Sequence, residues 1–121
     1  KVCGLLQKSS RWDPTVTPAQ QLLDFATING AKAIGMQDKI GSLEVGKYAD
    51  VVILDGKAPN LRPLLPENMI ANIAYSASSL NVKTVLCQGD VVVDDRRITT
   101  LDVGSVLDAS EDAWRYLCQR S

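Results

Sequence analysis

The side chains that most often carry enzyme chemistry are sparse in this sequence. Histidine does not occur among its 121 residues. This absence rules out a Ser-His-Asp or Cys-His nucleophile, an HxH or HExxH metal pair, and an imidazole base that titrates near neutral pH. The sequence therefore assigns no catalytic, cofactor-binding or metal-ligating residue to this chain.

Three cysteines remain as candidate nucleophiles or metal ligands: Cys3, Cys87 and Cys118. Their odd number and wide spacing fit neither a disulfide framework nor a CxxC metal knuckle. A nucleophilic cysteine also needs a nearby base, and the most usual base is missing. We interpret them as reduced thiols that pack as small apolar side chains, which favours a cytoplasmic location.

Carboxylates are the other candidates. Asp94-Asp95 could bind a cation, but the adjacent Arg96-Arg97 favours a solvated turn with ion pairing. Asp50 and Asp55 flank an apolar run and could in principle do the same. For Asp50 we expect a structural role, in which its carboxylate caps the neighbouring turn at Gly46-Lys47.

The segment Ile40–Lys47 superficially resembles a phosphate-binding loop. It departs from the GxxxxGK[ST] motif because Tyr48 stands where a serine or threonine must hold magnesium. Phosphate binding is therefore not expected.

Helical patterns dominate the first 35 residues. Val2, Leu5 and Leu6 predict a helix over 1–11, which the Trp12-Asp13-Pro14 segment ends. A second helix is expected to start at Thr17–Gln20, with Thr17 as N-cap, Pro18 at the first helical position and Gln20 completing a capping box. The remaining boundaries are a break at Asn29-Gly30 and a short helix over 31–34 that Gly35 stops.

Strand patterns follow Gly35. The apolar run 49–55 predicts a strand covered on both faces, and two β-branched runs around Gln88-Gly89-Asp90 predict a hairpin. Val51, Ile53, Val85 and Val91 should share one sheet. The other expected elements are a proline-rich loop over 59–66, a short helix or turn over 67–74, an edge strand over 98–101 and a final helix over 103–119.

The composition is that of an ordinary globular chain, with 45% apolar residues, 22% charged residues and a net charge of -1. Lysine and arginine are scattered, so neither nucleic acid nor an anionic membrane surface is an expected partner. The longest apolar run, Val51–Leu54, is far shorter than the roughly 20 residues of a membrane span. No secretory signal is recognisable, and the absence of a starting methionine fits a piece of a longer chain.

Two ordered segments carry a family resemblance. Ala26–Gly35 reads ATINGAKAIG, and Ile40–Asp55 reads IGSLEVGKYADVVILD. Together they resemble the C-terminal signature of the amidohydrolase superfamily of metal-dependent hydrolases. The later run resembles the branch that contains cytosine, guanine, chlorotriazine and adenosine-type deaminases and hydrolases, through Tyr75–Ser78, Val82, Thr84-Val85, Gly89, Arg97 and Leu101-Asp102.

The resemblance implies an α+β chain that forms the C-terminal portion of a (β/α)8-barrel hydrolase. Residues 1–35 would supply the last barrel helices, 36–102 part of a small composite β-sandwich, and 103–121 a C-terminal helix. The metal ligands of the family are an HxH pair, two later histidines and an aspartate, and none of them maps onto this chain. A divalent metal, zinc or iron, is expected in the full-length enzyme and none in this chain, which alone should be inactive.

Three functions stay open at this point. We favour a non-catalytic segment of a hydrolase of non-peptide C–N bonds, acting on S-adenosylhomocysteine, methylthioadenosine or 5'-deoxyadenosine. The alternatives are a fragment of a chlorotriazine chlorohydrolase and a stand-alone interaction module. The expected partners are the remainder of the parent enzyme and, through an exposed sheet edge, a second copy.

Overall fold

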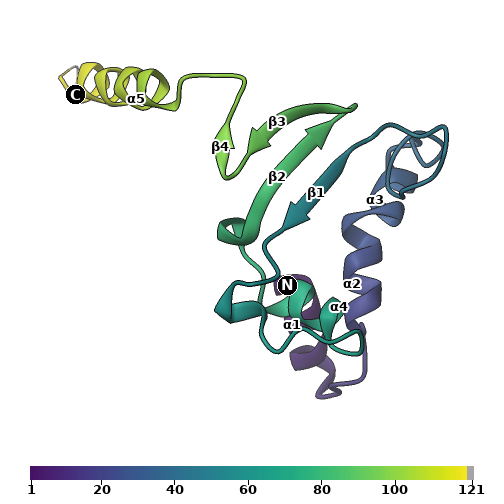
Figure 1. Cartoon of the computed structure of the whole chain (residues 1–121). Coiled ribbons are helices and arrows are strands. Elements are labelled where there is room, and N and C mark those ends of the chain that lie inside the picture. Colours follow the sequence, from purple (N-terminus) through teal and green to yellow (C-terminus); the bar gives the residue numbers. More distant parts are fainter. Residues whose placement is uncertain (120–121) are drawn as a thin grey trace.

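The computed structural model describes residues 1–119, which form helices at both ends and a small antiparallel sheet between them (Figure 1). Along the chain the elements are α1 (Val2–Arg11), α2 (Ala19–Ala26), α3 (Ile28–Ala33), β1 (Val51–Leu54), the 3-10 turn η1 (Pro59–Leu61), α4 (Met69–Tyr75), the 3-10 turn η2 (Ser79–Asn81), β2 (Val82–Cys87), β3 (Asp90–Asp94), β4 (Arg97–Ile98) and α5 (Val103–Cys118).

The four strands pair antiparallel in the order β1-β2-β3-β4. The predicted hairpin is confirmed, because β2 and β3 meet at a two-residue turn. Gln88 and Gly89 both have positive φ, 52° and 94°, which is the backbone that matches the twist of tightly joined strands. Val51, Ile53, Val85 and Val91 lie in this one sheet, as predicted.

Two predicted helix boundaries are wrong. Thr17 does not cap α2, because its φ of 52° is left-handed and the helix starts at Ala19 with no side-chain cap. Gln20 instead donates from Nε2 to Asp24 Oδ1 at 2.7 Å. The predicted break at Asn29-Gly30 lies at Thr27, where φ and ψ are -126° and -103°, and α3 continues through Gly30.

The buried core lies where α2 contacts α4 and the preceding loop. Leu22, Ala31 and Leu61 are its buried apolar residues, and Gly4 of α1 approaches Leu22 closely. Asn81, 2% exposed, is held by a reciprocal pair of amide hydrogen bonds with Asn60, both 2.9 Å long. Paired amides of this kind meet the requirement that buried polar groups be hydrogen-bonded.

The expectation that the 49–55 strand is covered on both faces is wrong for this chain. Val52 is 57% exposed and Ile53 is 46% exposed, and β1 forms one edge of the sheet. The strand itself is present, but the described residues do not cover its two faces. Within this part of the chain, no helix is long and apolar enough to span a bilayer.

At the far edge of the sheet, α5 projects beyond β4 (Figure 1). Every residue of this helix is exposed. Asp102 caps its first turn, since Oδ1 accepts from the Gly104 amide at 3.0 Å and Oδ2 from the Ser105 hydroxyl at 2.7 Å. These hydrogen bonds, Ser105 first, hold the pKa of the Asp102 carboxyl below its usual range.

Candidate functional site

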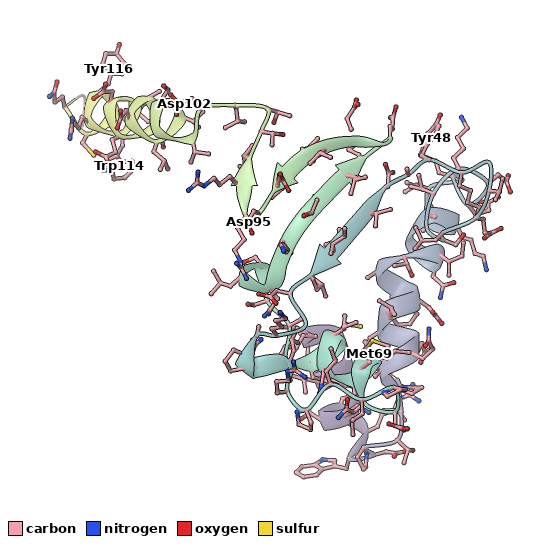
Figure 2. The ribbon with its side chains drawn as sticks, viewed as in Figure 1. Tyr48, Met69, Asp95, Asp102, Trp114 and Tyr116 are labelled. Carbon is pink, nitrogen blue, oxygen red and sulfur yellow. The ribbon has the colours of Figure 1, made fainter. Side chains whose placement is uncertain are left out.

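The glycine-rich segment between α3 and β1 is closed by its own polar side chains. Lys47 Nζ donates to Ser42 Oγ at 2.6 Å and pairs with Glu44 Oε1 at 3.1 Å. Ser42 in turn donates to Glu44 at 2.5 Å, and this bond, followed by those from Lys47, lowers the pKa of Glu44. Lys47 is therefore engaged inside its loop, and Tyr48 lies on the adjoining exposed segment (Figure 2).

Gly41 and Gly46 allow this loop to turn, with φ of 92° and 93°. The two glycines differ in surroundings. A Cβ at Gly41 would lie 2.8 Å from Ala31 Cβ and 3.0 Å from Ile28 Cα, whereas a Cβ at Gly46 would meet nothing within 4 Å. Only Gly41 lets the loop lie directly against α3, so it fixes the path of the chain from helix to sheet.

Asp50 has the structural role expected of it, but at a different turn. Its Oδ1 accepts from the backbone amide of Gln88 at 2.7 Å, across 38 positions of sequence. The expected cap of the Gly46-Lys47 turn is therefore wrong. The carboxylate instead joins the start of β1 to the β2–β3 hairpin, and the Gly89 amide adds a bond to the Ala49 carbonyl at 3.2 Å.

Arg96 forms the ion pair expected in its turn, although its partner is distant in sequence. Its guanidinium lies 2.6 Å from Asp55 Oδ2, just after β1. The Lys57 backbone amide and then Arg96 hold the pKa of Asp55 below its usual range. Asp95 and Arg96 themselves form the turn between β3 and β4, with φ of 41° and 68°. No sequence signal pairs residue 55 with residue 96.

β1 faces a hollow on each side. On one face, an apolar hollow of about 640 Å³ separates it from α2 and α3 and is lined by Leu23, Ile34, Ile40, Val52 and Ile73 among others. On the other, a shallower hollow of about 600 Å³ contains Ile53 and Leu64 beside Lys57, Arg62, Lys83 and Arg96. Exposed apolar surface of this kind commonly marks an interface.

The described residues do not fit a metal centre by themselves. Across residues 1–119, no three histidine, cysteine, aspartate or glutamate side chains gather at one place, and three or four such donors are what zinc requires. The three cysteines are free and exposed, so the expectation that they pack as apolar side chains is wrong. They lie on the surfaces of α1, β2 and α5 rather than in the small core.

Comparison with known proteins identifies the family. The model of the amidohydrolase family matches residues 2–92. The chain belongs to the amidohydrolase family. Its mixture of helices with a small antiparallel sheet therefore corresponds to part of an amidohydrolase fold.

Relatives of this amidohydrolase chain are deaminases. It is 43% identical over 119 residues to the 5-methylthioadenosine/S-adenosylhomocysteine deaminase of Desulforudis audaxviator, covering 98% of this chain and 27% of that protein. It is 37% identical over 121 residues to the 5'-deoxyadenosine deaminase of Methanosarcina acetivorans, covering 100% of this chain and 27% of the relative. The chain thus spans about a quarter of the length of the proteins it matches.

Solved structures show the same fold. A zinc-bound adenosine deaminase from Xanthomonas campestris superposes with a TM-score of 0.88 at 32% identity, over 98% of this chain and 26% of that one. A triazine hydrolase variant superposes with a TM-score of 0.70 at 21% identity, over 87% and 22% of the two chains. The second likeness shows the shared fold alone.

Proposed function

We propose that this amidohydrolase chain is the non-catalytic C-terminal segment of a deaminase of 5'-modified adenosines, such as methylthioadenosine, S-adenosylhomocysteine or 5'-deoxyadenosine. One observation carries the proposal: two relatives with these names match the chain over 98% and 100% of its length, at 43% and 37% identity. The zinc-bound adenosine deaminase structure described above also matches almost the whole chain.

We assign residues 1–35 to the last barrel helices, 36–102 to strands of a small sandwich, and 103–121 to a terminal helix, of which residues 120 and 121 lie outside the described part of the chain. The two hollows beside β1 support it, because exposed Val52 and Ile53 need cover that the described residues do not provide. The remainder of the parent enzyme would supply that cover and complete the free edge of β1. We place this enzyme in the cytoplasm.

In such an enzyme a divalent metal, zinc or iron, would activate water for hydrolytic deamination. The residues of this chain would not hold it. Their contribution would be positional: Gly41 and the Asp50–Gln88 bond fix how α3 meets the sheet, and this joint sets how the barrel helices and the sandwich are held together.

The test compares the natural gene product that contains this sequence with residues 1–121 alone. We expect the longer protein to release ammonia from the three adenosine derivatives after loading with zinc or iron, and the 121-residue chain to release none. Atrazine and a peptide serve as control substrates. Chloride release from atrazine without deamination would instead favour the chlorohydrolase alternative.

A gene product that has neither activity would overturn the proposal and favour the interaction module. Metal analysis of the 121-residue chain gives an independent arm. One tightly held ion per chain would contradict the assignment of every metal ligand to residues outside it.

A further inference from the structure

The connection between β1 and β2 is long for two neighbouring antiparallel strands. Such strands can be joined by a two-residue turn, yet here residues 55–81 separate the end of β1 from the start of β2. This connection, which we call the strap, contains η1, α4 and η2, and its helix α4 contacts α2 (Figure 1). The strap therefore reaches from the sheet to the helical end of the molecule.

A pair of side-chain amides closes the strap. Asn60 and Asn81 exchange two hydrogen bonds of 2.9 Å, and Asn60 Nδ2 also donates to the Ser76 carbonyl at 2.8 Å. Asn81 Oδ1 accepts in addition from the Ser78 backbone amide at 2.9 Å. Both the oxygen and the nitrogen of the buried Asn81 side chain thus have partners inside the strap.

On the helical side, a further asparagine holds α4 to the turn η1. Asn72 Nδ2 donates to the Leu61 carbonyl at 3.1 Å and to the Pro63 carbonyl at 2.8 Å. Leu61 is only 2% exposed and belongs to the same small core as Leu22 of α2. The side-chain amides therefore hold in place the segment that packs into this core.

On the sheet side, the strap depends on Asn81 again. Its backbone carbonyl accepts from the Asp55 amide at 2.7 Å, directly after β1, and β2 begins at the next residue, Val82. One buried residue is thus bonded to η1 through its side chain and to the end of β1 through its backbone. If η1 moves away from η2, a buried amide loses its partner, which is unfavourable.

Local capping does not account for this arrangement. Ser78 and Asn81 form a capping box around η2, which needs no other residue. Asn60 lies 21 positions from Asn81, so the bonds between them contribute nothing to that cap. Buried amides that are fully paired favour one arrangement of the surrounding elements, because other arrangements leave them without partners.

We infer that the strap is a conformational lock between the helices and the sheet, and that the Asn60–Asn81 pair is its closing contact. Breaking this pair releases α4 and the end of β1 together. The inference concerns residues 55–81 and does not depend on deaminase activity.

Amide hydrogen exchange followed by NMR tests the lock at both of its ends. Asn60→Ala changes only the helical side, yet it should accelerate exchange of the Asp55 amide and of the α4 amides by the same factor, about tenfold or more. The matched control is Asn68→Ala, at a residue whose side chain bonds only to residues 65 and 72 of the described chain. It should accelerate exchange at the start of α4 and leave the Asp55 amide unchanged.

Two exchange results would overturn the inference. One is an Asp55 amide that keeps its protection in Asn60→Ala, which would show that the two ends open separately. The other is equal acceleration of that amide by Asn60→Ala and Asn68→Ala, which would indicate a general loss of stability. The variants are prepared in the 121-residue chain and in the longer gene product, so that a variant too unstable in the short chain is measured in the longer one.

A double-mutant cycle supplies a second readout. Asn60→Ala and Asn81→Ala are made singly and together, and urea denaturation gives the unfolding constant of each protein. Because either change breaks the same pair, the product of the two single increases should exceed the increase in the double variant by about fivefold or more. Increases that simply multiply would show that the two asparagines act independently and would overturn the inference.

Discussion

At the scale of single residues, Asp50 gives the ADVV part of the signature a physical role. We predict that Asp50→Ala lowers the free energy of unfolding by about 1 kcal/mol, because the Gln88 amide loses a charge-assisted acceptor. Asp38→Ala, at an exposed aspartate for which no hydrogen bond is observed, is the control and should melt like the parent. Chemical denaturation of both variants measures the difference; equal midpoints would show that the hairpin does not need the carboxylate.

Asp55 provides a pH-dependent contact. Its folded-state pKa is lowered, first by the Lys57 amide and then by Arg96, so its stabilising effect is present above the unfolded pKa of about 3.9 and is lost as pH falls through the lower folded value. We therefore expect the β1 end of the sheet to loosen only in acid. An NMR titration of the Asp55 carboxyl checks this, and Arg96→Gln should move its pKa upward but not fully to the usual value.

These long-range contacts are the part of the site that sequence reasoning missed. The spacing around Asp50 indicated a cap, and the acceptor role was right, but the turn it caps lies 38 positions away. The prediction that Thr17 caps α2 was wrong for a local reason, since its left-handed φ removes its hydroxyl from the start of the helix. Residue types predict what a side chain can bind, whereas the identity of the partner depends on how separate elements come together.

At the scale of elements, the two glycines of the signature loop make a matched pair. Both have φ near 92°, so Gly46→Ala and Gly41→Ala share the cost of placing a side chain on that backbone, about 1 kcal/mol. Only at Gly41 does the added methyl collide with Ala31 and Ile28. We predict that Gly41→Ala destabilises by about 2 kcal/mol more than Gly46→Ala, measured by urea denaturation.

A smaller difference between the glycine variants would mean that α3 shifts freely and that the loop does not fix how α3 meets the sheet.

Most of the helices and strands could be predicted from the sequence, because hydrophobic periodicity and turn residues are local properties. The helices over 1–11 and 103–119 and the β2–β3 hairpin were located to within a residue or two. The Asn29-Gly30 break was wrong because α3 tolerates Gly30 in its interior.

At the scale of the whole molecule, β1 is an edge strand with a hollow on each face, although its sequence is that of a covered strand. Ile53→Asp should therefore cost the isolated chain only about 1 kcal/mol, because Ile53 is already 46% exposed there. In the longer gene product, where we propose that β1 is covered, the cost should rise to about 3 kcal/mol or more. Thermal melts of both proteins, with Lys39→Gln at an exposed residue outside both hollows as the control, distinguish the two cases.

Equal losses of stability from Ile53→Asp in the two proteins would mean that the remainder of the enzyme does not cover this strand.

The family could be inferred from ATINGAKAIG and GSLEVGKYADVV because these segments encode a particular loop and strand order. The substrate could not, since no residue of this chain is predicted to touch it. The surface that covers β1 could not be predicted either, because an apolar strand sequence indicates that the strand is covered but does not identify the covering surface.

The exposure of α5 has a further consequence for how its backbone exchanges hydrogen with solvent. A helix without tertiary cover opens at almost no free-energy cost, so in the dilute monomer the amides of residues 107–118 should exchange with deuterium nearly as fast as those of an unstructured peptide. The amides of β2, bonded to strands on both sides, should exchange far more slowly. Mass spectrometry of peptic fragments measures both rates, and slow exchange throughout α5 would show that the helix is covered.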